Sequence, residues 1–490
     1  MYEPRTPLYL SSDIRQLEQL ESGGSLMAKA GLALATLAQE IAADNADPIL
    51  IVAGPGNNGG DGLVAALHLK QGWHRVIVVL AADPAKLPAD AAKAYQAWMA
   101  DGNSCLDAIP ADTRFSLAID GLFGIGLQRP LEGRFAALVR HINQLPCPVL
   151  SIDIPSGLDA DSGRILGCVI EADYTLTFLA AKPGLYTLEG PDHAGTVLVS
   201  DLGIAAPDQL SPRGWLLEDC MFRPALPPRK QNSHKGLFGN VAILGGSDGM
   251  TGAALLAARA ALLSGGGRIY VGLLSETAPL LDPAQPELML RQATELHDQI
   301  DASCAVIGPG LGRSPQAAKL LKTWLEKPVP LVLDADALQL IGQNAELGKT
   351  LATREQLAVI TPHPGEAAAL LHCTSSDIQH DRINSALQLA QEFQAITVLK
   401  GAGTVIAEPG GHWYINTTGN PGLSSAGTGD VLAGMTGAFI AQEIEVGHAA
   451  RLAVYLQGAA ADALVAHGTG PVGLTASEIA LKVRTLINQR

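Results

Sequence analysis

The sequence has little positive charge and no paired cysteines. Its 490 residues hold 33 Lys and Arg against 48 Asp and Glu, which gives a formal net charge of −15. So acidic a chain, with no basic stripe, is unsuited to nucleic acid, and we expect phosphates to be held by backbone N–H groups and single cations. Its six cysteines form no C-x-x-C pair. Neither a zinc site nor a disulfide framework is therefore indicated, and we read them as reduced core thiols.

Long apolar runs are also missing. No stretch reaches the ~18 uninterrupted apolar residues of a membrane helix, and no basic segment followed by an apolar run opens the chain. We therefore expect a cytoplasmic protein without a membrane partner. With 47% hydrophobic residues, and at ~100 to 200 residues per domain, the chain should form two or three globular domains.

The most informative stretch is the small-residue segment Ser424–Asp430, which runs directly into a long apolar helix. Glycines at the mouth of a helix let a ligand approach the backbone, and the unpaired N–H groups of the first turn bind anions. A carboxylate beside a phosphate is repelled unless it has a role such as taking a proton, so Asp430 is a candidate general base. The alternative is that Asp430 caps the helix. Because Gly427 and Gly429 precede it, we favour the active site.

The N-terminal half reads as a parallel α/β unit. After a helix over 11–43, an apolar strand at Ile49–Ala53 leads into a loop at Gly54–Gly62, a helix from Leu63 to about Lys70 and a strand at Val76–Leu80. Loops at the carboxyl ends of parallel strands form ligand crevices. This loop lacks the G-x-G-x-x-G pattern and adds two Asn side chains. The alternative reading is a tight Gly-Asn turn.

Two further apolar strands end in acidic residues, at Asp120 and Asp153. Adjacent strand ends meet at one edge of a parallel sheet, so Asn58, Asp120 and Ser156 can converge as hard oxygen ligands. Such ligands suit an alkali or alkaline-earth cation. Asp153 then remains free for acid/base chemistry. The alternative for each residue is a capping role at the following turn.

A segment without periodicity, 224–236, predicts a linker, and a second α/β series follows it. We expect a strand at Val241–Leu244, a helix from about Gly252 to Leu263, and strand ends that carry Gly308, Asp334, His363 and Lys400. The chain should therefore hold two α/β domains, at residues 1–219 and 222–490.

The order of these motifs resembles the bifunctional NAD(P)H-hydrate repair enzymes over nearly the whole chain. The motifs are Gly54–Gly62, the Asp120 and Asp153 strand ends, Gly308–Gly312, Thr361–Glu366, Lys400–Gly401 and Ala426–Asp430. The resemblance implies a Rossmann-like NAD(P)HX epimerase domain followed by a ribokinase-like, ADP-dependent (S)-NAD(P)HX dehydratase domain. The first would interconvert the R and S epimers of hydrated NADH and NADPH. The second would dehydrate the S form while ADP becomes AMP and phosphate.

The resemblance also implies roles for individual residues. Asp153 and Asp430 would be catalytic, with K⁺ held in the first domain by Asn58, Asp120 and Ser156, and Mg²⁺ used with ADP in the second. The hydrate would contact Asn57, Asn58, Gly59, Gly60, Asp61, Gly124, Ile125, Gly126, Leu127, Gln128, Arg129, Pro130 and Asp153 in the first domain, and Ala253, Gly310, His363 and Asp430 in the second. The adenylate would contact Lys400, Gly401, Ala402, Gly403, Thr404 and Gly429.

Several alternatives stay open. His363 could be a surface or hydrogen-bonded histidine and not a ligand contact, and Lys400 could simply be solvated. Asp334 and Asp336 are either structural or assist Mg²⁺. A ribokinase-like small-molecule kinase with an accessory domain would share the Gly-Thr-Gly-Asp chemistry, and the first domain could sense a nucleotide without turnover, although Asp153 argues against a mere sensor. We expect a homo-oligomer whose size the sequence does not give.

Overall fold

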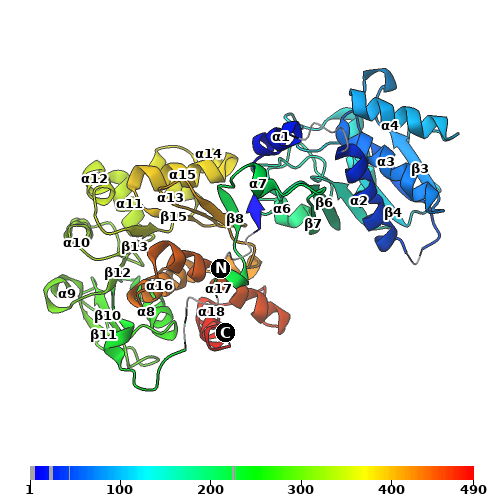
Figure 1. Cartoon of the computed structure of the whole chain (residues 1–490). Coiled ribbons are helices and arrows are strands. Elements are labelled where there is room, and N and C mark those ends of the chain that lie inside the picture. The colour runs from blue at the N-terminus through cyan, green and yellow to red at the C-terminus, as the bar shows by residue number, and fades with distance from the viewer. Residues whose placement is uncertain (1–5, 21–25, 44, 223–225, 227, 490) are drawn as a thin grey trace. The chain divides into compact units, whose positions relative to one another are not determined.

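A computed structural model of the chain describes residues 6–20, 26–43, 45–222, 226 and 228–489 (Figure 1). They form two compact units, Thr6–Gly214 and Trp215–Arg490. The predicted boundary between residues 219 and 222 lies slightly further along the chain, because β8 (Gly214–Leu216) already pairs at the edge of the second sheet. The N–H of Leu217 extends this pairing with a bond to the carbonyl of Ile415.

The N-terminal unit is built on a parallel sheet of β-strands in the order β3-β2-β4-β5-β6-β7. Their bounds are β2 Ile49–Ala53, β3 Val76–Leu80, β4 Leu117–Gly121, β5 Val149–Ile152, β6 Tyr174–Phe178 and β7 Thr196–Ser200. Every adjacent pair runs in the same direction. All carboxyl ends therefore share one edge, as the sequence predicted.

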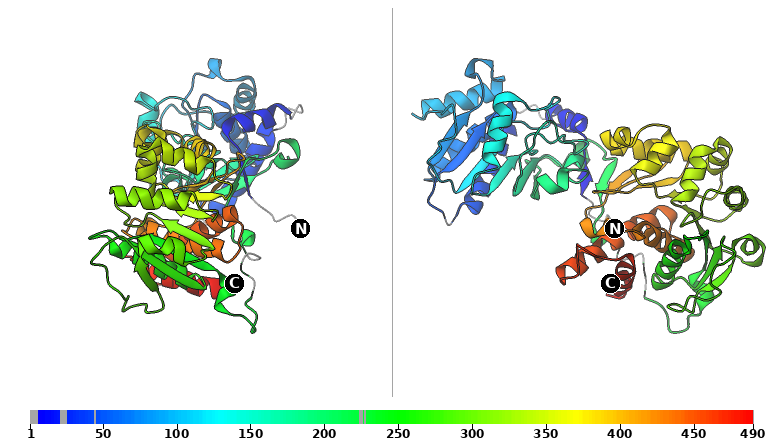
Figure 2. Two further views of the ribbon diagram at one scale, coloured as in Figure 1. Left: turned by 90° about the vertical axis from the view of Figure 1, so that its left-hand side faces the viewer. Right: turned by 180° about the vertical axis from the view of Figure 1, so that it is seen from behind.

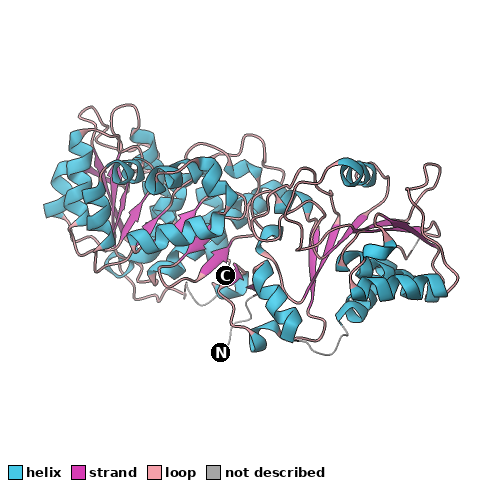
Figure 3. Cartoon of the chain, turned by 90° about the horizontal axis from the view of Figure 1, so that it is seen from above, coloured by secondary structure: helices cyan, strands magenta, loops and turns pink. Residues whose placement is uncertain are grey.

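Both faces of this sheet are covered, which explains why its central strands are continuous apolar runs. Alternate residues of β2 point to opposite faces. Ile51 packs in the core beneath α2 (Leu26–Ile41), α3 (Asn57–Gln71) and α4 (Ala89–Ala100), whereas Leu50 packs on the side of α5 (Gly133–Ile142). Figure 3 shows the strands of each unit between helices.

Two predicted elements of this unit are wrong in extent. The helix over 11–43 is divided into α1 (Ser11–Leu20) and α2, and residues 21–25 between them lie outside the described residues. The predicted loop Gly54–Gly62 ends early, because α3 begins at Asn57. The glycines serve close packing here: a Cβ on Gly59 would lie 2.3 Å from the carbonyl oxygen of Gly54.

The C-terminal unit has a larger sheet in the order β8-β17-β16-β15-β14-β13-β12-β9-β10-β11. Strands β9 to β15 are parallel, and β16 and β17 add an antiparallel edge. The bounds are β9 Asn240–Gly245, β10 Arg268–Leu273, β11 Met289–Gln292, β12 Cys304–Ile307, β13 Leu331–Leu333, β14 Ala358–Ile360, β15 Ile396–Leu399, β16 Val405–Ala407 and β17 Trp413–Ile415. Strand β9 confirms the strand predicted at Val241–Leu244, and β12, β13, β14 and β15 end shortly before Gly308, Asp334, His363 and Lys400, as predicted.

Helices α8 (Thr251–Leu263), α16 (Thr428–Ala441) and α17 (Val446–Ala466) form one core with this sheet. The other helices of the unit are α9 Ala293–Gln299, α10 Pro315–Leu325, α11 Asp336–Gln343, α12 Ala345–Ala352, α13 Pro364–Leu371, α14 Ser375–His380, α15 Arg382–Phe393 and α18 Ala476–Asn488. Figure 2 shows the unit from two further sides. Helix α16 is buried almost all round, which is why its sequence is apolar throughout.

Short elements complete the chain. They are β1 Pro7–Leu8, α6 Gly190–His193, α7 Ala206–Gln209 and the 3₁₀ turns Pro84–Lys86, Pro183–Leu185, Asp219–Met221, Lys235–Phe238 and Pro421–Leu423. Residues 224, 225 and 227 of the predicted linker lie outside the described residues.

None of the helices in the described ranges is long and apolar enough to cross a membrane. All six cysteines are free. Cys304 is buried in the core of the C-terminal unit, and Cys105, Cys147, Cys168 and Cys220 are partly buried and pack against the cores. The expectation of core thiols is wrong for the exposed Cys373.

Candidate functional site

A cavity of about 370 Å³ opens at the carboxyl edge of the N-terminal sheet. Its walls come from α1, the turn before α3, and the segments that follow β4, β5 and β6. The lining residues are Ile14, Arg15, Glu18, Pro55, Gly56, Asn57, Asn58, Asp61, Leu122, Phe123, Gly124, Ile125, Gly126, Leu127, Asp153, Phe178, Leu179 and Lys182. The structure thus brings most of the predicted hydrate-binding residues of this unit together.

Asp153 directly follows β5 and has a left-handed backbone with φ of 66°, a conformation that L-residues adopt at a cost and mainly at functional sites. Its Oδ1 accepts hydrogen bonds from the Lys182 ammonium at 2.5 Å, the Thr177 hydroxyl at 3.2 Å and the Phe178 N–H at 3.2 Å. Its Oδ2 faces the cavity loop, 3.5 Å from where a Cβ on Gly124 would stand.

Asp61 and Asn58 enter the cavity from α3. Burial, followed by the negative charges of Asp153 and Glu18, raises the pKa of Asp61 well above its usual value. The Asn58 side chain donates to the Ile152 carbonyl at 3.1 Å, and its Oδ1 lies 3.1 Å from the Cβ position of Gly124. Asp61 thus holds its proton more tightly than an ordinary Asp side chain does.

Asp120 and Ser156 are in direct contact, as predicted. The fully buried Asp120 carboxylate accepts from the Ser156 hydroxyl at 2.6 Å, the Ser156 N–H at 2.8 Å, the Ser151 hydroxyl at 2.9 Å and the Leu122 N–H at 3.2 Å. Burial raises the pKa of Asp120, and the donors from Ser156 and its neighbours oppose that rise. Here the capping alternative is realised at Leu122, and Asp120 also ties the segment after β4 to Ser151 of β5 and to Ser156 in the segment after β5.

Some predicted contacts lie outside this cavity. The residues absent from its lining are Gly59, Gly60, Gln128, Arg129 and Pro130. Gly60 packs instead against Met27, whose Cε would be 2.5 Å from an added Cβ. Their roles as substrate contacts stay predictions.

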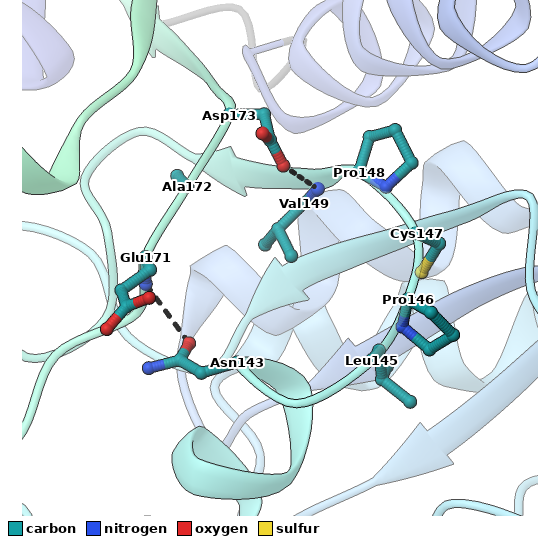
Figure 4. A pocket seen from close by; sticks show the side chains of 9 residues that line it. All are labelled: Asn143, Leu145, Pro146, Cys147, Pro148, Val149, Glu171, Ala172 and Asp173. Atoms are coloured by element: carbon teal, nitrogen blue, oxygen red, sulfur yellow. Dashed lines mark hydrogen bonds between the residues drawn. The ribbon is translucent and has the colours of Figure 1, made fainter.

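A second, open cavity of about 500 Å³ lies at the opposite edge of the same sheet, where β5 and β6 begin (Figure 4). Its polar groups are engaged with each other: Asp173 accepts from the Val149 N–H at 2.8 Å, and Asn143 accepts from the Glu171 N–H at 3.0 Å. This cavity contains none of the residues that the sequence predicted for chemistry.

In the C-terminal unit, Asp430 lies in the first turn of α16. Gly427, with φ of 90°, caps the helix, so the alternative that Asp430 is the cap is wrong. Desolvation by burial raises the pKa of Asp430 to about 7, with smaller contributions from Asp334, Asp336 and Glu366, while Lys400 opposes the rise. A carboxyl group whose pKa is near 7 is suited to accept a proton at physiological pH.

Lys400 follows β15 and lies beside the same turn. Its ammonium contacts the Asp334 carboxylate at 2.8 Å and Glu366 at 3.7 Å. An added Cβ on Gly429 would stand 3.3 Å from the ammonium. The positive charge and the open N–H groups of α16 therefore face the same space, as anion binding requires.

Asp334 and Asp336, left unassigned by the sequence, both hold other groups. Asp334 Oδ1 also accepts from the Thr361 hydroxyl at 2.8 Å. Asp336 accepts from the Gly312 N–H at 2.9 Å and from Arg313 at 3.3 Å. Asp334 thus fixes the lysine, and Asp336 fixes the glycine loop after β12.

The remaining predicted residues of this unit lie on neighbouring loops. A Cβ on Gly310 would be 3.3 Å from that of Ala253, so these two predicted hydrate contacts are adjacent. His363 caps α13: its Nδ1 accepts from the Gly365 and Glu366 N–H groups, and its ring remains about half exposed. The structural role that we weighed for His363 is real, and its exposed edge leaves the ligand contact as a prediction.

Sequence reasoning missed two buried cations. Lys182 is fully buried on Asp153, and its signal was a charge inside the apolar run Leu179–Pro183. Arg382 is 1% exposed, donates to the carbonyls of Leu399 and Lys400, and so braces the turn into Gly401. Nothing in its helical sequence context signals this.

Two parallel α/β units, each with an acidic site at the carboxyl edge of its sheet, define a two-unit α/β enzyme. A family model described as NAD(P)H-hydrate dehydratase matches residues 241–483, and one described as YjeF-related protein N-terminus matches residues 23–184. The bifunctional NAD(P)H-hydrate repair enzyme Nnr of Coxiella burnetii is 37% identical over 99% of this chain and 100% of its own length. The enzyme of the same description from Escherichia coli is 38% identical over 90% of this chain and 85% of its own. The chain therefore belongs to the family of bifunctional NAD(P)H-hydrate repair enzymes.

Solved structures resemble the C-terminal unit. The ADP/ATP-dependent NAD(P)H-hydrate dehydratase of Bacillus subtilis, co-crystallised with ATP and Mg²⁺, is 32% identical with a TM-score of 0.50, and the match covers 56% of this chain and 98% of that one. A ribokinase-like superfamily protein of Enterococcus faecalis is 28% identical, also with a TM-score of 0.50, over 56% of this chain and 95% of its own. The predicted ribokinase-like fold is confirmed.

Proposed function

We propose that the chain repairs hydrated NADH and NADPH in two steps, with the N-terminal unit as epimerase and the C-terminal unit as dehydratase. Family membership supports the overall activity. The observation that carries the second step is Asp430, a carboxyl with a pKa of about 7 at a helix N-terminus beside Lys400.

In the dehydratase unit, the hydroxyl of the hydrate is a poor leaving group. Asp430 removes its proton, the oxygen takes the terminal phosphoryl group of ADP, and AMP is released. The phosphorylated oxygen then departs as phosphate with the electron pair of the C–O bond, and the neighbouring ring carbon loses a proton to solvent, which restores the double bond of the dihydronicotinamide. The N–H groups of the Gly427 turn and the Lys400 ammonium stabilise the charge that develops on the phosphoryl oxygens.

Mg²⁺ supplies charge neutralisation on ADP when bound. The acidic groups near Asp430 have partners already: Asp334 holds Lys400, Asp336 holds Gly312, and Glu366 holds the His363 N–H. Because Mg²⁺ keeps several waters and commonly binds through substrate phosphates, the ADP oxygens are its main ligands in this proposal.

In the epimerase unit, K⁺ is assigned to Asn58, Asp120 and Ser156. The donor set is oxygen only, as an alkali cation requires. The Asp120 carboxylate is fully buried without a lysine or arginine partner in the described part of the chain, so a cation would compensate its charge. The Ser156 hydroxyl donates its proton to Asp120 and accepts from the Phe123 N–H at 2.8 Å, so its second lone pair would be the one that binds the ion.

The test is direct. Purified hydrated NADH is supplied with ADP and Mg²⁺, and the return of dihydronicotinamide absorbance is followed. AMP, free phosphate and NADH in equal amounts support the proposal. A stable phosphorylated product would instead support the rival small-molecule kinase.

The assignment of one activity to each unit is tested by separation. Fragments 1–213 and 214–490 should each fold, the first with epimerase and the second with dehydratase activity, because each has its own core. A fragment that starts at residue 222 lacks β8 and Leu217, so it should be less stable than 214–490. If neither longer fragment is soluble and active, the assignment is wrong. Cytoplasmic location and a homo-oligomeric state stay predictions.

A further inference from the structure

The epimerase cavity holds two carboxyl groups with different surroundings, Asp153 and Asp61. The Lys182 ammonium can donate three hydrogen bonds, and all three have acceptors: Asp153 Oδ1 at 2.5 Å, the Phe178 carbonyl at 2.7 Å and the Thr177 hydroxyl at 2.8 Å. Lys182 therefore has no proton left to offer a substrate or Asp61. It acts on the reaction only through Asp153.

The two oxygens of Asp153 are not equivalent. Oδ1 is occupied by three donors, from Lys182, Thr177 and Phe178. Oδ2 has no hydrogen-bond partner among the residues described here, and it faces the Gly124 loop that lines the cavity. A carboxylate anchored by one oxygen and open at the other is oriented to accept a proton at the second.

Asp61 has the opposite setting. It lies on α3 within the same cavity, with no lysine on it, and with the negative charges of Asp153 and Glu18 near it. Of the other charged groups at the cavity, Arg15 and Glu18 stand on α1, where Arg15 donates to the Ile125 carbonyl at 3.3 Å. Asp153 is held by a lysine ammonium, whereas Asp61 is surrounded by negative charge. Two carboxyl groups in such different surroundings are suited to serve as acid and base.

We propose that Asp61 is the proton donor of the epimerase, that Asp153 Oδ2 is the proton acceptor, and that Lys182 is the positioning residue that keeps these roles apart. The proposal rests on the epimerase function proposed above. It assigns the direction of proton flow in the cavity and gives Lys182, a residue without a role so far, a specific one.

The proton balance is closed. Asp61 protonates the hydroxyl of the hydrate, the C–O bond breaks with its electron pair on the oxygen, and water leaves, while the ring nitrogen supplies an electron pair to the carbon. Water then adds from the other face through its oxygen, and Asp153 takes the released proton. One proton has passed from Asp61 to Asp153, and its return through cavity water, or a turnover in the opposite direction, resets the pair. No oxidant or reductant is involved.

The experiment follows the full-length chain with the purified R epimer, without ADP, by chromatographic separation of the two epimers from pH 5 to 10. A blank without enzyme corrects for spontaneous epimerisation. The wild type should give a bell-shaped profile. Urea unfolding of each full-length variant, compared with the wild type by circular dichroism, reports that the N-terminal unit is folded, and dehydration of the S epimer reports the amount of active protein in the same preparation. A wild type that does not epimerise would overturn the proposed function itself, before the role of any residue is tested.

Three variants test the roles. Lys182→Met removes the charge and should slow epimerisation about ten- to a hundredfold at neutral pH. It should also move the acid limb, which is the low-pH side of the pH–rate profile, to higher pH by about one to three units, the usual effect of losing an adjacent opposite charge. Lys182→Arg should restore part of the acid-limb position. Asp61→Asn keeps shape but cannot give a proton, so epimerisation should fall about a hundredfold and the alkaline limb should disappear.

Two outcomes would overturn the inference. One is a Lys182→Met enzyme with reduced rate but an unshifted acid limb, which would make Lys182 merely structural. The other is an Asp61→Asn enzyme with normal rate and an intact alkaline limb. If Lys182→Met fails to fold, Thr177→Val removes one donor from Asp153 Oδ1 and one acceptor from Lys182 while the charge stays. It should then move the acid limb upward by a smaller amount, and an unshifted limb counts against the proposal.

Discussion

Replacing Asp430 by Asn should make the dehydratase unit more stable and less active. The pKa of Asp430 rises from 3.8 to about 7, mainly because the buried carboxylate is poorly solvated. At about 1.4 kcal/mol per unit, this rise sets a ceiling of about 4 kcal/mol for the cost of ionising it in the folded state. Partial exposure of the turn reduces the cost, and we expect about 1 to 2 kcal/mol.

The pH dependence of this cost has a defined sign. Well below pH 3.8 the carboxyl is neutral in both states and costs nothing. As the pH rises toward 7, the unfolded chain releases this proton while the folded chain keeps it, so the wild type loses stability. Asn cannot ionise. The variant should therefore exceed the wild type only slightly at pH 4, where the carboxyl of the unfolded chain is about half ionised, and by the full amount above pH 7.

The assay is urea unfolding followed by tryptophan fluorescence at pH 4, 6 and 8, together with the rate of dihydronicotinamide recovery. The rate should fall at least about a hundredfold, the usual contribution of a general base. The matched control is Asp377→Asn. Asp377 is an exposed residue in the first turn of α14, where hydrogen bonds from Thr374 lower its pKa, so this change should reduce stability at neutral pH. Near-normal dehydration by Asp430→Asn, or a stability change that does not grow with pH, would refute the reasoning.

Other changes test the remaining parts of both sites. Lys400→Met should raise the KM for ADP at least about tenfold with epimerisation unchanged, because the positive charge beside the helix N-terminus is lost; steady-state kinetics with varied ADP check this. Asp120→Ala should weaken hydrate binding and slow epimerisation while dehydration of the S epimer is unchanged, and replacing K⁺ in the buffer by a large organic cation should mimic it. Epimerisation insensitive to K⁺ would contradict the cation assignment. Gly434→Ala should destabilise the chain by about 1 to 3 kcal/mol in urea, because the new Cβ would stand 2.0 Å from the carbonyl oxygen of Ala257. Gly252→Ala, in a helix where an added Cβ meets nothing within 4 Å, should be neutral or stabilising.

The positions of the strand ends could be predicted because buried parallel strands are short apolar runs that stop abruptly. Asp120 and Asp153 were located in this way. The extent of α3 could not be predicted from the sequence, because glycine usually disfavours a helix and signals a loop. In α3 the glycines are needed where the helix packs against Gly54 and Met27, and such contacts are invisible in one sequence.

The long-range partners were equally hidden. Lys182 reaches Asp153 across 29 positions of the chain, and Lys400 reaches Asp334 across 66. Each pair forms because the strands of a parallel sheet bring distant segments to one edge: β5 and β6 are adjacent, whereas β13 and β15 are separated by β14. Strand ends are local features, whereas pairing between them depends on the strand order, which the sequence pattern leaves open.

The two sites place their lysines differently with respect to the base. In the N-terminal unit Lys182 contacts Asp153 itself, while burial and the negative charges of Asp153 and Glu18 raise the pKa of Asp61. In the C-terminal unit Lys400 contacts Asp334 and not Asp430, whose pKa burial raises to about 7 although Lys400 opposes the rise. Epimerisation needs an acid and a base at the same time, and phosphoryl transfer needs one base and a positive charge free to meet the phosphate. The position of one lysine relative to the reacting carboxylate therefore matches each unit to its reaction.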